Sequence, residues 1–223
     1  MSIASDIDLS QFDTPGRGRG LLDVFSRGYL LRLLVRQGTA TRYRNSVLGW
    51  TWSYLKPATQ FLVYYFVLGL VLQMQRNVEN YPIYLFTAII VINLFSEGFG
   101  NATTAITENS ALVRKIYMPR ELFPVAAIIV SLIHFLPQAI ILLLVCILVG
   151  WTPSLVGVGI ILAGIALIGV FSLGLGMMFG AVNVRFRDAQ NFVDIIKMVA
   201  FWSVPAVYTW QMVQVALPEW LFR

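Results

Sequence analysis

The sequence predicts an all-α membrane protein, and three observations lead to this prediction. Hydrophobic residues make up 58% of the 223 residues, and the mean hydropathy is +0.75. Charged residues make up 12%, whereas soluble domains carry about 25%. The apolar residues also fall into long runs, which a soluble domain of this length could not bury. In a membrane protein the positions of the lysines and arginines matter more than the net charge of +5. No nucleic-acid partner is therefore expected.

Residues 1–20 are expected to form a flexible cytoplasmic tail. They contain three aspartates, followed by an Arg- and Gly-rich stretch from Pro15 to Gly20. A secretory signal peptide needs an apolar core behind a basic start. Because this segment has no such core, it is not interpreted as a signal peptide.

Residues 21–57 are expected to contain an interfacial amphipathic helix and an elbow. The stretch 20–36 is rich in leucine with arginines scattered through it. From Tyr29 on, Arg32 and Arg36 share one face of an ideal helix. Gly28 is a candidate break in that helix. The density of charge argues against a membrane span and predicts a helix lying on the inner leaflet.

The elbow is the stretch "RYRNSVLGWTWSYLKP". It combines Arg42 and Arg44, which anionic headgroups attract, with Trp50 and Trp52, whose rings suit the headgroup level. It is interpreted as a membrane anchor, although any first membrane helix could carry such a flank. Pro57 is expected in the first turn of the next helix, where its missing N–H costs nothing.

Residues 58–223 are expected to form a transmembrane domain, because five segments come close to the roughly 20 apolar residues that cross a bilayer. Lysine and arginine concentrate before the first segment and in the second and fourth loops, which places the N-terminus inside. Five spans would leave the C-terminus outside, so a sixth span is expected to be missing from this chain. The predicted spans are about 58–74, 82–106, 122–149, 155–182 and 192–210.

Three spans contain ionisable side chains that need a partner. Glu97 lies fifteen residues after Pro82, or about 22 Å along a helix, in the cytoplasmic half of its span. It is expected to line a translocation path or to pair with a nearby cation. An equally good interpretation is an ordinary carboxylate near the inner interface. Asp194 and Lys197 are spaced to pair on one face of the last span. His134 is interpreted mainly as a packed hydrogen-bonding group.

Small and aromatic residues suggest two further roles within the spans. Gly176 and Gly180 form a G-x-x-x-G pattern in a span that also carries Gly157, Gly159, Gly164, Gly169 and Gly174, and this pattern predicts close helix packing. Aromatic rings could stack on sugar, or could form interface belts. The candidates for a glycan path are Tyr64, Tyr65, Glu97, Trp202 and Tyr208.

No enzyme motif is found. The chain has one histidine and one cysteine, and it lacks the spacings of a metal site and the glycine-rich loop of a nucleotide-binding site. No catalytic residue and no metal site are therefore expected. The stretch 109–124, "NSALVRKIYMPRELFP", is long for a connection between spans. It could bind a cytoplasmic partner or face inner-leaflet lipid.

Three stretches together resemble the permease subunits of bacterial ABC transporters of the type-2 class, which export polysaccharide, O-antigen or teichoic acid. They are "YRNSVLGWTWSYLKP", "NSALVRKIYMPRELFP" and "VNVRFRDAQNFV", and the similarity runs from about Tyr29 to Trp220. The resemblance implies six membrane helices, a homodimer and two separate ATPase subunits that bind ATP and Mg²⁺. It also implies an element that couples to the ATPase, made of Asn109, Leu112, Arg114, Lys115, Tyr117, Arg120 and Glu121.

The resemblance implies a function in the bacterial cytoplasmic membrane, namely export of a lipid-linked polysaccharide driven by the ATPase. "KIYMPRELFPV" and "YLKPATQFLV" look most similar to actinobacterial galactan exporters. Teichoic acid, drug or lipid export stays open within the class. Two other classes are a membrane-embedded glycan or lipid transferase, for which Glu97 and Asp194 are the candidate carboxylates, and a channel that needs no ATPase.

Overall fold

The computed structural model describes residues 20–42, 46–76, 78–115, 118–152, 154–204 and Tyr208, and this part of the chain is helical with no strand. Three of its helices are long and apolar enough to cross a membrane: α4 (Tyr81–Glu108), α6 (Leu122–Leu148) and α7 (Leu155–Arg185). They coincide closely with the second, third and fourth predicted spans. The prediction of an all-helical membrane chain is confirmed.

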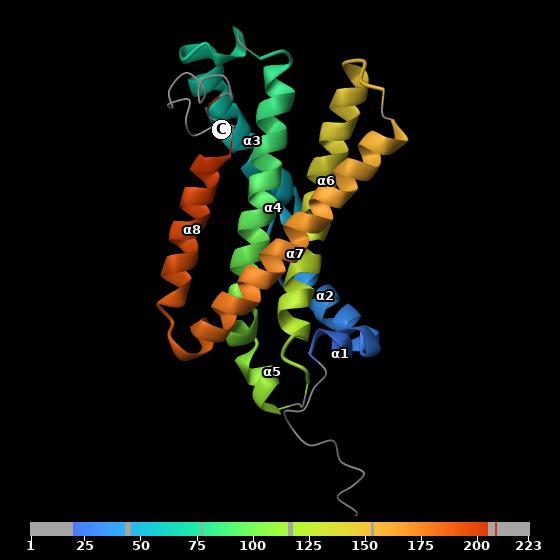
Figure 1. The fold of residues 1–223 in the computed structure, drawn as a ribbon, viewed down its shortest axis with the longest axis vertical. Coiled ribbons are helices and arrows are strands. Elements are labelled where there is room, and N and C mark those ends of the chain that lie inside the picture. Colours follow the sequence, from blue (N-terminus) through green and yellow to red (C-terminus); the bar gives the residue numbers. More distant parts are fainter. Residues whose placement is uncertain are drawn as a thin grey trace, which may run out of the picture.

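Helix α4 is the centre of the bundle. In Figure 1, α7 crosses α4 diagonally, α6 lies on one side, and α8 (Ala189–Ser203) lies on the other. The contacts agree, since α4 packs against α3 (Trp52–Tyr64), α6, α7 and α8. Leu85, Ile89 and Phe99 of α4 are fully buried. The outer faces of α6 and α7 expose many Leu, Ile and Val side chains, as expected of helices that face lipid.

The ends of two long helices are set by local sequence. Asn80, just before α4, has a left-handed backbone with φ of 52°, and Pro82 stands in the first turn of the helix, where its missing N–H costs nothing. At the start of α7, the side-chain oxygen of Ser154 accepts a hydrogen bond from the backbone N–H of Gly157 at 3.0 Å. This is an ordinary N-cap.

Helices α4 and α7 approach closely because glycine replaces a side chain at their contact. A Cβ built on Gly176 would lie 2.4 Å from the Cβ of Ala102, and one built on Gly180 would lie 3.2 Å from the carbonyl oxygen of Thr103. The packing predicted from the G-x-x-x-G pattern is confirmed. The remaining glycines are not all used in this way, since a Cβ on Gly174 would meet nothing within 4 Å.

The first predicted span begins earlier than expected. Helix α3 begins at Trp52 and continues directly into the π-helical segment η4 (Tyr65–Val71). The expectation that Pro57 lies in the first turn is therefore wrong, because Pro57 lies inside α3. A proline there cannot donate to the carbonyl of Ser53, four residues earlier. Gln138 of α6 supplies the missing bond, since its Nε2 donates to that carbonyl at 3.0 Å.

The predicted interfacial helix is divided into two. Helix α1 (Leu21–Ser26) ends at Arg27, and α2 (Gly28–Arg42) begins at the glycine that was expected to break the helix. Helix α2 continues beyond Arg36, where the prediction stopped, as far as Arg42. It packs against α6, where a Cβ on Gly38 would lie 3.1 Å from Val130.

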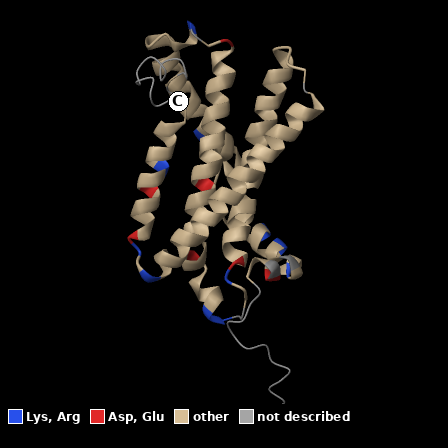
Figure 2. Cartoon of the chain, viewed as in Figure 1, with Lys and Arg blue, Asp and Glu red and all other residues tan. Residues whose placement is uncertain are grey.

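Lysine and arginine gather at one end of the molecule. Figure 2 shows this cationic end, which contains α1, α2, the short helix α5 (Ser110–Lys115) and the turn between α7 and α8. The turn η5 (Met74–Arg76), just before α4, lies at the opposite end and includes Arg76. The predicted tail, 1–19, and Arg44 lie outside the described residues.

Candidate functional site

One face of α4 carries a row of polar side chains within an otherwise apolar helix. Asn93, Glu97, Asn101, Thr104 and Glu108 follow one another at intervals of three or four residues, so they share one face of the helix. This row is called the polar stripe. It lies on a different side of α4 from the Ala102 contact with α7. In a membrane helix such a row is costly unless it faces protein or water.

A groove runs between the polar stripe and α8. It has a volume of about 340 Å³, and it is called the α4–α8 groove. Both helices contribute polar side chains to it, including two carboxylates from α4 and one ammonium from α8. Its lining consists of Ser96, Glu97, Gly100, Asn101, Thr104, Glu108, Gln190, Val193 and Lys197.

Glu97 forms an ion pair with Arg42, the last residue of α2. Both side chains are partly exposed, at 37% for Glu97 and 28% for Arg42. Pairing reduces the cost of placing each charge within the membrane region, which is a few kcal/mol for an isolated charge. The carboxylate therefore has the cation partner that was predicted, and it also lines the groove.

A second ion pair lies on α8, where Lys197 Nζ is 2.8 Å from Asp194 Oδ1. This confirms the predicted pairing. Lys197 approaches α4 so closely that a Cβ on Gly100 would lie 2.9 Å from its Nζ, so the glycine leaves room for the ammonium. A transferase would need Glu97 and Asp194 to face one cavity. Instead each carboxylate pairs with its own cation, and Asp194 is not among the residues that line the groove.

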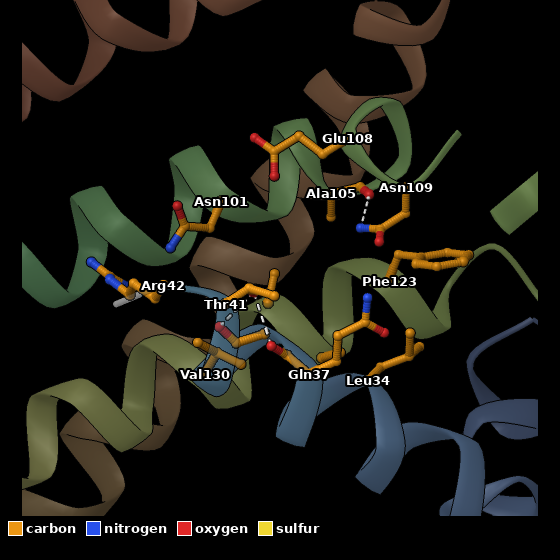
Figure 3. A pocket seen from close by; sticks show the side chains of 13 residues that line it. Leu34, Gln37, Thr41, Arg42, Asn101, Ala105, Glu108, Asn109, Phe123 and Val130 are labelled. Atoms are coloured by element: carbon orange, nitrogen blue, oxygen red, sulfur yellow. Dashed lines mark hydrogen bonds between the residues drawn. The ribbon is translucent and has the colours of Figure 1, made fainter. Parts of the chain in front are cut away.

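A larger cavity of about 470 Å³ lies between α2, α4 and α6, and Figure 3 shows its lining. Amide and hydroxyl groups of Gln37, Thr41 and Asn101 point into the space, and Phe123 closes one end. Asn101 and Glu108 line both this cavity and the groove. The part of the polar stripe from Asn101 to Glu108 therefore borders both the cavity and the groove.

A third cavity, of about 260 Å³, lies between α2, α3, α4 and α6. It is called the elbow cavity because Trp52 and Lys56 of the elbow line it together with Gln60, Asn93, Glu97 and Gln138, among others. Asn93 Nδ2 donates to Gln60 Oε1 at 3.1 Å. This bond joins α3 to the polar stripe.

The elbow is attached to α6 through His134. Trp50 Nε1 donates to His134 Nδ1 at 3.1 Å, and Ser53 Oγ lies 3.2 Å from the same nitrogen. His134 is 1% exposed, so the interpretation of this histidine as a packed hydrogen-bonding group is confirmed. Trp50 and Trp52 remain 48% and 37% exposed, which leaves part of each side chain available for the predicted contact with headgroups.

The other residues predicted for a glycan path do not surround Glu97. Tyr64 lies against Phe201, with ring centroids 5.6 Å apart, and the Tyr65 hydroxyl donates to Gln75 at 3.3 Å. The Tyr208 hydroxyl donates to the carbonyl of Ser203 at 2.8 Å. Tyr64 and Tyr65 pack against the apolar cluster that contains Leu68 and Tyr81. Trp202 is 59% exposed beside Phe201.

The predicted coupling residues lie at the cationic end. Asn109 ends α4 and is half-buried, and its Nδ2 donates to the carbonyl of Ala105 at 2.8 Å. Leu112 is half-buried, while Arg114, Lys115 and Arg120 are exposed. Glu121 immediately precedes α6. Arg32 and Arg36 of α2 are also exposed, and Tyr117 lies outside the described residues.

Sequence reasoning missed most of the polar stripe. The charge of Glu97 marks it in the sequence, whereas Asn93, Asn101 and Thr104 are uncharged and are absent from the predicted site. Their helical spacing within the second predicted span was the available signal. Gln60 and Gln138 could not have been found in this way, because their roles depend on contacts between helices that are distant in sequence.

Comparison with known proteins supports a transport function. The family model described as ABC-2 type transporter matches residues 29–223. The chain is 30% identical to the O-antigen export system permease protein RfbA of Klebsiella pneumoniae, over 85% of this chain and 73% of the relative. It is also 30% identical to the protein of that name from Myxococcus xanthus, over 84% and 71%. Identity to the polysialic acid transport protein KpsM of Escherichia coli is 24%, over 70% and 60%.

Proposed function

Because this chain belongs to the ABC-2 type transporter family, we propose that it is the membrane permease subunit of an exporter that moves a polysaccharide across the bacterial cytoplasmic membrane. Two relatives that are 30% identical are O-antigen export permeases, and a third is a polysialic acid transport protein. The cargo we propose is a lipid-linked glycan of the O-antigen or galactan kind.

The observation that carries the mechanism is the α4–α8 groove. Its polar and charged lining lies on helices whose other faces are apolar. Hydroxyl-rich cargo needs hydrogen-bonding partners along its route, because an unpaired polar group costs several kcal/mol in hydrocarbon. We propose that the polar stripe forms one wall of that route. The ion pairs of Glu97 with Arg42 and of Lys197 with Asp194 give two charges of this wall a partner.

A second copy of the chain would supply the opposite wall. The groove is lined by α4 and α8 of one chain alone, which does not enclose a path large enough for a polymer. Closure of a two-fold dimer around the groove would place two polar stripes face to face. The proposed transporter is therefore a homodimer of this subunit.

ATP hydrolysis is assigned to separate ATPase subunits, which bind ATP and Mg²⁺, since the sequence carries no nucleotide-binding loop. The cationic end would face the cytoplasm by the positive-inside rule, with the N-terminus inside and α3/η4 and α8 as the first and fifth spans. Helix α5 and its exposed Arg114 and Lys115 would contact the ATPase. ATP would drive transport by binding two conformations of the assembly with different affinities.

The test is reconstitution of the permease with its ATPase in vesicles that contain the lipid-linked glycan, with transport followed by access of an external lectin. Charge reversal of Arg114 and Lys115 to Glu should lower ATP-dependent transport about tenfold or more, while assembly of the permease is retained. Arg76→Glu, at the opposite end of the molecule, is the matched control and should leave transport close to that of the parent protein.

Three results would contradict the proposal. Transport without the ATPase would indicate a channel. Synthesis of the glycan by the permease alone would indicate a transferase. Equal loss of transport in the Arg76→Glu control would remove the cationic end as the coupling surface.

A further inference from the structure

The elbow cavity has a chemical character that the proposed transport route does not explain. It lies beside the α4–α8 groove and shares Ser96 and Glu97 with it. Three of its lining side chains are deeply buried, with Ser53 at 6%, His134 at 1% and Gln138 at 9% exposure. A cavity with such a polar lining is an expensive feature in a membrane helix bundle.

Gln138 presents a buried acceptor that is not satisfied. Its Nε2 donates to two carbonyl oxygens, those of Ser53 at 3.0 Å and His134 at 3.3 Å. Two carbonyl acceptors at this nitrogen fix the orientation of the amide. Its Oε1 is buried and has no hydrogen-bond partner among the described residues. An acceptor left in this way costs free energy until a donor arrives.

The rest of the lining can both donate and accept hydrogen bonds. The bond between Asn93 and Gln60 uses one polar atom of each amide, which leaves Asn93 Oδ1 to accept and Gln60 Nε2 to donate. Lys56 adds an ammonium group, and neither ion pair found in the described residues includes it. Trp52 adds a partly exposed ring to the same wall.

This combination fits a sugar ring better than a phosphate. A sugar hydroxyl both donates and accepts, and the apolar face of a sugar ring can stack on an aromatic ring. An ionised phosphate only accepts, so it would leave Gln138 Oε1 without a donor. Of the two cations in the lining, Arg42 is already paired with Glu97. The cavity volume of about 260 Å³ lies just below the range of pockets for drug-sized ligands, which suits one sugar unit rather than a chain.

We propose that the elbow cavity binds a single sugar unit of the exported glycan, with Gln138, Asn93 and Gln60 as hydrogen-bonding groups and Trp52 as the stacking surface. This inference rests on the proposed function, because the cavity connects with the groove. It adds a specificity site beside Asn93 and Glu97, at the end of the polar stripe farther from Glu108, where a unit can be held as the glycan passes along the route.

The test uses the permease assembled with its ATPase in lipid nanodiscs. Methyl glycosides of a hexose, a 6-deoxyhexose and an N-acetylhexosamine serve as probes, and binding is measured by saturation-transfer NMR. At least one glycoside should bind saturably. Gln138→Leu and Asn93→Ala should each weaken its binding about tenfold, as expected for loss of a hydrogen bond in a dry site.

Asn183→Leu is the matched control, because it also removes a buried amide of a membrane helix. Asn183 lies on α7, and within the described residues its amide makes two long hydrogen bonds, 3.5 Å to the Thr103 carbonyl and 3.4 Å to Thr107 Oγ1. Binding of the glycoside should be unchanged in this variant. If Gln138→Leu fails to assemble, Asn93→Ala decides the question, since it leaves the Gln138 bonds to α3 and α6 in place.

Several outcomes would overturn the inference. They are the absence of saturable glycoside binding in a preparation that exports glycan, unchanged binding in both cavity variants, and displacement of the glycoside by inorganic pyrophosphate in a manner that depends on Lys56. The first outcome leaves the proposed function intact. Failure of ATP-dependent export in a preparation that binds glycosides would instead contradict the proposed function alone.

Discussion

The two sides of α4 show how one membrane helix can serve as a scaffold and as a working surface. Toward α7, Ala102 meets Gly176 with so little space that an added methyl group would collide, and a methyl group on Gly180 would lie 3.2 Å from the carbonyl oxygen of Thr103. Toward α8 and the elbow, the same helix turns polar side chains into cavities. The side toward α7 is tightly packed, whereas the side toward α8 and the elbow borders cavities lined by charged and hydrogen-bonding groups.

This difference has an energetic reason. Between membrane helices there is little hydrophobic driving force, so close packing of small residues supplies much of the stability. Polar groups in the same region cost free energy and persist only where they are partnered or functional. We therefore expect changes on the α7 side to act on folding, and changes on the polar side to act mainly on transport.

The largest expected effect is on the packed side. Gly176→Ala places a Cβ 2.4 Å from the Cβ of Ala102 and 3.4 Å from the carbonyl oxygen of Phe99, so the two helices must separate. The free energy of unfolding should fall by about 1–3 kcal/mol, as for overpacking in a core. Thermal unfolding of the purified permease in detergent measures this.

Gly174→Ala is the control, two residues earlier on the same helix. A Cβ there meets nothing within 4 Å, and alanine is a better helix former than glycine. This variant should be as stable as the parent protein or slightly more stable. Equal destabilisation by both substitutions would show that α7 is sensitive to any change, and that the contact with Ala102 is not special.

A smaller effect on stability is expected at the Arg42–Glu97 ion pair. Glu97→Gln removes the carboxylate that faces Arg42. Breaking a fully buried pair costs about 3–5 kcal/mol, but these side chains are 28% and 37% exposed, so solvent screening reduces the expected loss to about 1–2 kcal/mol. Glycan export in vesicles should fall more than this loss of stability explains, because Glu97 also lines the α4–α8 groove.

A double-mutant cycle sharpens this prediction. Arg42→Met and Glu97→Leu should each lower the free energy of unfolding. The double variant should recover part of that loss, since it removes both charges and leaves no unpaired one. Additive effects in the cycle would mean that the pair contributes no coupling energy. Unchanged export in Glu97→Gln would exclude the carboxylate from the transport route.

Local sequence patterns predicted where the long helices begin and end much better than they predicted which residues of different helices touch. The ends of α4, α6 and α7 followed from apolar length and proline positions, and the α4–α7 contact followed from the G-x-x-x-G pattern. The start of α3 before Pro57 could not be predicted, because it depends on Gln138 of α6 bonding the freed carbonyl of Ser53. Such long-range partners leave no periodic signal along the chain.

The candidate site shows the same limit. The sequence identified Glu97 as a charge that needed a partner, but the partner, Arg42, is 55 residues away and had been assigned to the headgroups. His134 was expected to be packed, yet its bond to Trp50 crosses 84 residues. The pair of Asp194 and Lys197 was predictable because its geometry is fixed within one helical turn.

The smallest effect is expected at the ion pair of Asp194 and Lys197 on α8. Asp194 is 61% exposed, and exposed ion pairs within a helix contribute about 0.3–0.5 kcal/mol. Asp194→Asn should therefore change the free energy of unfolding by no more than about 0.5 kcal/mol in the same detergent assay. Lys197 remains over Gly100 in this variant, so its ammonium still lines the groove and export should stay near the parent level. A large loss of export would mean that Asp194 itself contacts the cargo, and the working surface of the molecule would then extend from α4 across to the far side of α8.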